Sequence, residues 1–193
     1  MTELAAAEVR FTEAELLAAL RLRFTFSGNG GSGRYAFLTH VRTGAAWDQQ
    51  EIDAVVVCLW PSDDHELLAF EVKCSRTDWL REIRPDISKS ERTRSLCDSF
   101  TIVAPANVVS LGELPQGWGL IHAWRDSESG AVRLKQHTAP TPRSGNDTIA
   151  RSFLVAMLRA ADAVPGMTSG RRRARSHQLA TEPSTPTEQE RAG

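Results

Sequence analysis

Three charged residues interrupt two apolar stretches of this sequence. Asp53 lies within IDAVVV (residues 52–57), and Glu71 and Lys73 lie within LLAFEVK (residues 67–73). An ionised side chain among buried apolar residues carries a large desolvation cost unless it is paired or binds a ligand. Because Glu71 and Lys73 are two residues apart, a β-strand places them on the same face. We therefore expect that face to hold an ion pair or a ligand.

The residues between the two stretches predict that all three charged groups meet. PSDDH at 61–65 is turn chemistry, so the flanking strands should form an antiparallel hairpin that brings Asp53 beside residues 71–73. Two adjacent carboxylates repel, and each takes up a proton unless a divalent cation lies between them. Hard oxygen ligands suit Mg²⁺ or Mn²⁺, which also bind phosphate oxygens. A lysine beside such a cation can orient an attacking water and stabilise charge on phosphorus, so the pattern indicates phosphodiester hydrolysis.

The elements that must position these residues follow from periodicity and capping. Thr12 and Glu15 spell a capping box ahead of leucines at helical spacing, which predicts a helix over about 12–23. Ser75 with Asp78 three residues later marks a second helix start, and Pro85 should end that helix. The other expected elements are strands at 35–42, 51–60, 66–74, 98–105, 118–124 and 131–136 and helices at 86–96 and 146–162.

This order predicts an α/β fold with a central mixed sheet flanked by helices. The last helix carries Ile149, Phe153, Leu154 and Leu158 along one stripe, which we expect to face the core. The tryptophans at positions 60, 79, 118 and 124 lie in strand or helix frames and are also expected in the core. Residues 1–164 should form one domain. Residues 165–193 are rich in Arg, Ser, Thr and Pro without periodic apolar residues, which predicts a disordered tail.

Charge and cysteine content narrow the class of protein. The net charge of the 193-residue chain is −1. Residues 164–193 hold five Arg and three Glu, a surplus of two positive charges, so the rest of the chain carries −3 and nucleic-acid contacts should be local. The three cysteines show no C-x-x-C spacing, which favours a reducing compartment over a disulfide framework or zinc site. No secretion signal or membrane span is recognisable, so we expect a cytoplasmic protein.

The spacing of the charged residues also carries a family resemblance. Asp53, an 18-residue interval and Glu71-Val72-Lys73 resemble the PD-(D/E)xK nuclease superfamily. More narrowly, the segments DAVVVCLWPS, AFEVKCSRTDWLREI, CDSFTIVAP and ELPQGWGLI resemble the MmcB-like DNA-repair family of bacteria and actinobacterial phages. The resemblance spans about residues 12–136. It implies a restriction-endonuclease-like core of order α-β-β-β-α-β, followed here by extra C-terminal strands and a helix.

The resemblance assigns roles to individual residues. Asp53 and Glu71 would bind Mg²⁺ or Mn²⁺, with the backbone carbonyl of Val72 as a further ligand, and Lys73 would be the catalytic lysine. The superfamily often adds a glutamate from the first helix. Glu13 is the candidate, because it shares the inward face of Leu16 and Leu17 while Glu15 is the capping partner of Thr12. Lys89, where relatives carry a lysine on a helix, would add positive charge to the site.

DNA is the partner that this resemblance implies. Arg76 is a candidate DNA contact, and Arg171, Arg172 and Arg173 in the tail could supply sequence-independent phosphate affinity. Many relatives with this fold act as dimers, so a homodimer is also implied, although no stretch of the sequence identifies an interface. The predicted function is a metal-dependent DNA endonuclease acting in repair, recombination or phage DNA processing.

Other readings of the same residues stay open. Glu71 and Lys73 alone could be the solvated face of an edge strand. The acidic body of the chain favours a non-catalytic DNA-binding or protein-docking module that keeps the fold without the chemistry. Restriction or anti-phage defence would use the same site on a different substrate.

Overall fold

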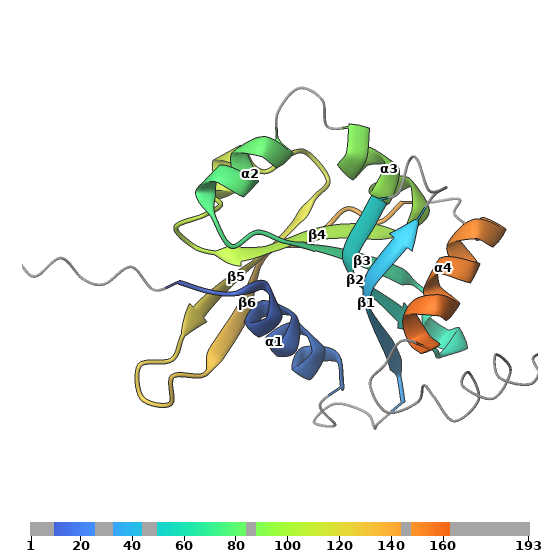
Figure 1. The fold of residues 1–193 in the computed structure, drawn as a ribbon, viewed down its shortest axis with the longest axis horizontal. Coiled ribbons are helices and arrows are strands. Elements are labelled where there is room, and N and C mark those ends of the chain that lie inside the picture. The colour runs from blue at the N-terminus through green and yellow to red at the C-terminus, as the bar shows by residue number, and fades with distance from the viewer. Residues whose placement is uncertain (1–9, 26–32, 44–49, 84–87, 144–147, 163–193) are drawn as a thin grey trace, which may run out of the picture. The chain divides into compact units, whose positions relative to one another are not determined.

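The computed structural model describes residues 10–25, 33–43, 50–83, 88–143 and 148–162. In chain order its elements are α1 (Glu13–Thr25), β1 (Tyr35–Thr43), β2 (Gln50–Cys58), β3 (Leu67–Val72), α2 (Arg76–Glu82), α3 (Ser88–Leu96), β4 (Ser99–Pro105), β5 (Gly119–Arg125), β6 (Val132–Thr138) and α4 (Arg151–Asp162). Two short 3₁₀ helices, η2 (Pro61–Asp63) and η3 (Leu111–Glu113), lie between strands. The predicted α/β class is confirmed (Figure 1). None of the described helices is long and apolar enough to cross a membrane.

The strands form one mixed sheet in the order β1-β2-β3-β4-β5-β6. β1, β2 and β3 are antiparallel neighbours, as are β5 and β6, whereas β4 runs parallel to both β3 and β5. A parallel pair needs a crossover connection, and α2 and α3 supply it between β3 and β4. Every residue of β4 is buried, which fits its central place in the sheet.

Two clusters of buried side chains cover opposite faces of the sheet. Along β4, Phe100 and Ile102 belong to the first cluster and Val103 to the second, as alternation along a strand requires. Leu16, Leu17 and Leu20 of α1 pack into the second cluster. Trp79 of α2 and Phe153 of α4 belong to the first. In Figure 1, α1 accordingly lies on one side of the sheet and α2 and α3 lie on the other.

The predicted capping residues begin both helices that flank the charged strand. The Thr12 backbone N–H donates to Glu15 at 2.9 Å, and the Glu15 N–H donates to the Thr12 hydroxyl at 3.3 Å. Ser75 accepts from the Asp78 N–H at 3.2 Å and donates its hydroxyl proton to the Asp78 carboxylate at 2.6 Å. These local bonds satisfy amide groups that a helix leaves unpaired at its first turn.

The sequence pattern predicted the wrong buried side for the last helix. α4 begins at Arg151, and residues 146 and 147 lie outside the described part of the chain. Of the expected stripe only Phe153 is buried, while Ile149, Leu154 and Leu158 are 45%, 45% and 60% exposed. Phe153 shares the sheet side with Ala156 and Met157. The helix is apolar on two sides, and periodicity alone cannot select the side that the sheet covers.

The tryptophans divide in the same way. Trp79 and Trp118 are buried, at 0% and 1% exposure, as predicted. The prediction was wrong for Trp60 and Trp124, which are 40% and 44% exposed. Trp60 follows the end of β2, and Trp124 is the next-to-last residue of β5. The predicted boundary between domain and tail at residue 164 lies outside the described residues.

Candidate functional site

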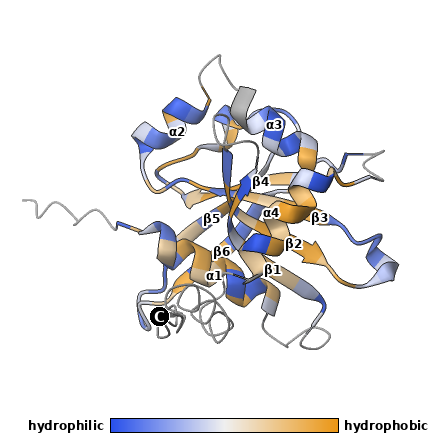
Figure 2. Cartoon of the chain, turned by 45° about the vertical axis from the view of Figure 1, so that its right-hand side comes forward, coloured by the Kyte–Doolittle hydropathy of each residue, from blue (hydrophilic) through white to orange (hydrophobic). Residues whose placement is uncertain are grey.

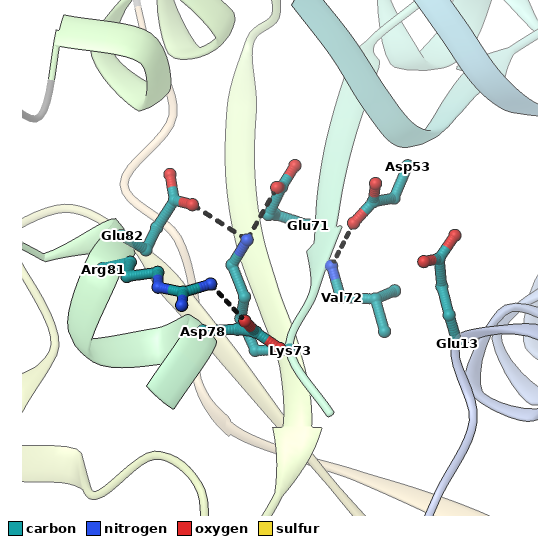
Figure 3. Close-up of a pocket in the computed structure, with 8 residues that line it drawn as sticks. All are labelled: Glu13, Asp53, Glu71, Val72, Lys73, Asp78, Arg81 and Glu82. Carbon is teal, nitrogen blue, oxygen red and sulfur yellow. Dashed lines mark hydrogen bonds and ion pairs between the residues drawn. The ribbon is translucent and has the colours of Figure 1, made fainter. Parts of the chain in front are cut away.

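The three charged residues that interrupt the apolar strands line one pocket of about 330 Å³. In the β2–β3 ladder the last pair is Ala54 with Phe70, so Asp53 and Glu71 are the next residue on each strand. The structure therefore brings together the groups that the hairpin geometry predicted. The residues that line the pocket are Glu13, Asp53, Glu71, Val72, Lys73, Asp78, Arg81 and Glu82 (Figure 3).

Asp53 is fixed by the backbone of the neighbouring strand. Its Oδ2 accepts a hydrogen bond from the Val72 N–H at 2.7 Å. This bond lies just past the last residue pair of the β2–β3 ladder. The Asp53 side chain therefore accepts the β3 backbone hydrogen bond at the point where the two strands no longer pair. The carboxylate is thereby held at the end of β3, next to the residues on either side of Val72.

Lys73 is a buried cation held between two carboxylates. Its Nζ lies 2.8 Å from Glu71 Oε1 and 2.8 Å from Glu82 Oε2, and the three side chains are only 6–10% exposed. Burial lowers the pKa of Lys73, but the charges and hydrogen bonds of Glu71 and Glu82 outweigh burial and raise that pKa overall. The ammonium group therefore stays protonated and can donate hydrogen bonds, but it cannot accept a proton.

Glu82 is the site residue that sequence reasoning missed. It is the last residue of α2 and reaches across to the lysine on the segment after β3 (Figure 3). The hydroxyl of Ser90 on α3 donates to the same carboxylate. Glu82 follows the buried Trp79 by three residues and so shares its helix face. That spacing is the one signal that could have placed Glu82 toward the sheet.

Glu13 reaches the pocket from α1, as expected from its helical spacing. Its side chain is 49% exposed, and its Oε1 lies 3.8 Å from the His40 Nδ1. His40 is also 3.0 Å from Glu51 Oε1 and has a left-handed backbone with φ of 53°, within β1. The histidine thus lies between a carboxylate of the pocket and one of the adjacent strand.

Negative charge dominates the pocket. Five carboxylates face two cationic groups, Lys73 and Arg81. Oxygen donors in negative surroundings suit a hard divalent cation, so the donor chemistry fits Mg²⁺ or Mn²⁺. Asp53 and Glu71 are the nearest candidates as ligands. In the geometry shown, however, no group of three or more His, Cys, Asp or Glu among the described residues is arranged to hold a metal ion.

The remaining predicted site residues do not line this pocket or are not among the described residues. Lys89 belongs to α3, but its side chain is not among the described ones, and Arg171, Arg172 and Arg173 also lie outside the described residues. Arg76 lines a different pocket, forms a two-pronged ion pair with Glu113, and donates to the Val108 carbonyl at 3.0 Å. A DNA contact by these arginines stays a prediction.

The Arg76–Glu113 pair predicts a specific dependence of stability on pH. The hydrogen bond from Arg76 is the main reason that the pKa of Glu113 falls from 4.5 to about 2. A carboxyl whose pKa is lower in the folded state stabilises the fold above its unfolded pKa and loses this effect as pH falls. We expect Glu113→Gln to unfold at a lower urea concentration than the parent at pH 7. The difference between the two urea midpoints should shrink as pH falls from 4.5 toward 2. Glu128→Gln, at an exposed position, is the control. If the stability of Glu113→Gln depends on pH in the same way as that of the parent, the ion pair with Arg76 is not the cause.

Comparisons with known proteins leave the family open. No protein-family model matches the chain, and no curated protein matches it. Among solved structures, the chain is similar to a protein of unknown function from Silicibacter pomeroyi. That similarity has a TM-score of 0.46 and 13% sequence identity, and it covers 82% of this chain and 85% of the other. A likeness at this level carries no statement about activity.

Proposed function

We propose that this protein is a metal-dependent nuclease of the PD-(D/E)xK type that hydrolyses phosphodiester bonds in DNA. The observation that supports the proposal is that Asp53, Glu71 and Lys73 line one pocket together with Glu13. The MmcB-like resemblance and a restriction-endonuclease-like arrangement of the α/β core belong to this proposal. Its setting would be DNA repair, recombination or phage DNA processing in the cytoplasm.

The carboxylates and the lysine would divide the work. Asp53 and Glu71, with the Val72 carbonyl, would hold Mg²⁺ or Mn²⁺, and Glu13 could add an oxygen. The cation would supply positive charge on the scissile phosphate and a lower pKa for a bound water. Lys73, kept protonated by Glu71 and Glu82, would donate hydrogen bonds to the phosphate oxygens as negative charge builds on them. Glu82 is then a positioning residue, because it would act through the lysine that it contacts.

The charge of the pocket makes DNA binding depend on the cation. Five carboxylates repel a phosphate at short range, and only two cationic side chains oppose them. Arg76 and the tail arginines at 171–173 would make backbone contacts that do not depend on sequence. We therefore expect DNA to bind more tightly with a divalent cation than with EDTA.

The test is cleavage by the purified 193-residue chain. Single-stranded, nicked, branched and linear duplex DNA are incubated with Mg²⁺, Mn²⁺ or EDTA. Glu71→Gln keeps the shape and an acceptor for Lys73 but removes the charge, and it should slow cleavage by about 100-fold or more. Glu128→Gln, an exposed glutamate on another strand connection, should cleave like the parent. Cleavage that persists in EDTA, or in Glu71→Gln, would refute the proposal.

A second candidate function is a non-catalytic DNA-binding or protein-docking module. One observation favours it: Asp53 and Glu71 already bond within the protein, to the Val72 N–H and to Lys73. The lysine and its two glutamates would then be a structural ion cluster. Binding that survives EDTA, with no cleavage of any of the four DNA forms, is the outcome that selects this alternative.

A further inference from the structure

A second pocket, of about 370 Å³, lies at the carboxyl ends of two parallel strands. Cys74, which follows the end of β3 by two residues, lines this pocket, as does Pro105, the last residue of β4. In open α/β sheets, ligands bind outside the carboxyl ends of the strands. We call it the arginine pocket, because Arg10 and Arg76 also line it.

The arginine pocket adjoins the carboxylate pocket around Lys73. Lys73 lines the carboxylate pocket, and the next residue, Cys74, lines the arginine pocket. The hydroxyl of Ser75 in the arginine pocket donates to the carboxylate of Asp78 in the other pocket at 2.6 Å. A polymer that is cut in the carboxylate pocket can therefore place its neighbouring unit in the arginine pocket.

The two pockets differ in charge. Five carboxylates line the carboxylate pocket, whereas no Asp or Glu is among the described residues that line the arginine pocket. Arg10 is exposed, and its guanidinium makes no hydrogen bond or ion pair within the described part of the chain. A phosphate beside the reacting one therefore meets a favourable charge in the arginine pocket.

Arg76 is held in place before any ligand binds. Its guanidinium forms the two-pronged pair with Glu113 and donates from Nη1 to the Val108 carbonyl at 3.0 Å. These bonds use three of its five N–H groups, and no described residue accepts from the other two. A side chain that is already ordered loses little conformational freedom on binding. Because Glu113 offsets the charge of Arg76, Arg10 supplies most of the net positive charge.

Apolar side chains form a wall of the arginine pocket. Phe11 and Val108 are 8% and 5% exposed and belong to the two core clusters, so the fold fixes their positions. Figure 2 shows a hydrophilic α2 beside a largely apolar sheet, and the pocket draws residues from both. Asn107 is exposed and adds an amide that can donate and accept. This lining suits a nucleobase, which has apolar faces and hydrogen-bonding edges.

We propose that the arginine pocket binds the nucleotide next to the cleaved phosphate and thereby selects DNA in which that nucleotide is unpaired. The inference rests on the proposed nuclease function. The apolar wall would contact the base and Asn107 its edge, while Arg10 and Arg76 would bind the adjoining phosphate. A base enters such a pocket only after it leaves the stack, and this is least costly where the base is unpaired. The preferred substrate is then single-stranded DNA, or a duplex with an unpaired nucleotide at the cut.

Fluorescence anisotropy of the 193-residue chain tests the preference by binding alone. The probes are a labelled single strand, a blunt hairpin duplex, and the same duplex with one unpaired nucleotide. Ca²⁺, which also takes oxygen ligands, replaces Mg²⁺. The single strand and the interrupted duplex should bind about tenfold more tightly than the blunt duplex, or better. Equal or undetectable binding of all three probes overturns the proposal.

Arg10→Gln tests whether the arginine pocket produces this preference. The substitution removes a charge at an exposed position and keeps the backbone carbonyl that accepts from Arg125 at 3.4 Å. Single-strand binding should weaken by about tenfold, and the slope of log Kd against log salt concentration should fall by about 0.7. Arg159→Gln, at an exposed arginine of α4, is the matched control and should bind like the parent. Equal effects of the two substitutions would overturn the assignment to this pocket.

Cleavage separates this inference from the nuclease proposal. With Mg²⁺, the parent should cut the single strand and the interrupted duplex about tenfold faster than the blunt duplex, or better, and Arg10→Gln should lose most of this difference. Binding that prefers unpaired DNA, without cleavage of any probe, would refute the nuclease and support nucleotide binding by the pocket. Cleavage of paired and unpaired DNA at equal rates would support the nuclease and refute the selection.

Discussion

Replacing Lys73 by methionine is expected to lower the free energy of unfolding by about 3–5 kcal/mol at pH 7. Methionine keeps most of the side-chain volume but leaves Glu71 and Glu82, 6% and 10% exposed, without the cation that both contact. Two buried carboxylates that have lost a shared cation repel each other and remain poorly hydrated. Under the proposed function, the same variant should also lose cleavage by about 100-fold or more.

The pH dependence of this effect identifies its cause. Without the lysine, burial and mutual repulsion should raise the pKa of Glu71 and Glu82 in the folded state above their unfolded values. The folded state then binds more protons, so the deficit in stability should shrink as pH falls toward the usual glutamate pKa of about 4.3. Urea unfolding at pH 7 and near pH 5 measures this difference. Lys135→Met, at an exposed lysine of β6, is the matched control and should unfold like the parent; equal loss in both variants would contradict the argument.

Replacing Trp79 by alanine is expected to cost about 3–5 kcal/mol of unfolding free energy. The ring is fully buried in the first core cluster, and its Nε1–H donates to Glu113 at 3.3 Å. α2 has only seven residues, so it depends on packing for its helical structure. Because α2 carries Glu82, the variant should also loosen the contact that holds Lys73.

Trp60→Ala is the matched control for this substitution. The ring is 40% exposed, so its removal should cost much less, within about 1 kcal/mol. Thermal or urea unfolding followed by circular dichroism compares both variants with the parent. A loss of stability in Trp60→Ala that equals or exceeds the loss in Trp79→Ala would contradict the expectation that the buried ring of α2 stabilises the fold more than the half-exposed one.

The sequence predicted the part of the site that lies on adjacent strands. Charged residues inside apolar strands and a turn between them are local signals, and they were sufficient for Asp53, Glu71 and Lys73. Glu82 depends on how a helix packs over the sheet, which local patterns do not specify. The capping residues gave the starts of α1 and α2 for the same local reason.

The buried side of α4, by contrast, could not be predicted from local sequence patterns. Apolar residues lie on two sides of this helix, and both satisfy helical periodicity. The shape of the sheet surface against which the helix packs decides which side is covered. Small residues such as Ala156 allow close approach to that surface, which a hydrophobicity count does not register.

The alternation of Glu71, Val72 and Lys73 constrains how this chain can change in length. The Val72 side chain packs into the second core cluster, on the side of α1, while the side chains of Glu71 and Lys73 form a buried ion pair with each other. An insertion or deletion of one residue within β3 would reverse these orientations, placing a carboxylate and an ammonium group among the leucines of α1. The 3₁₀ turn before β3 is exposed and can absorb length changes without that inversion. Length variation should therefore gather at the turn and be absent from the strand beside it.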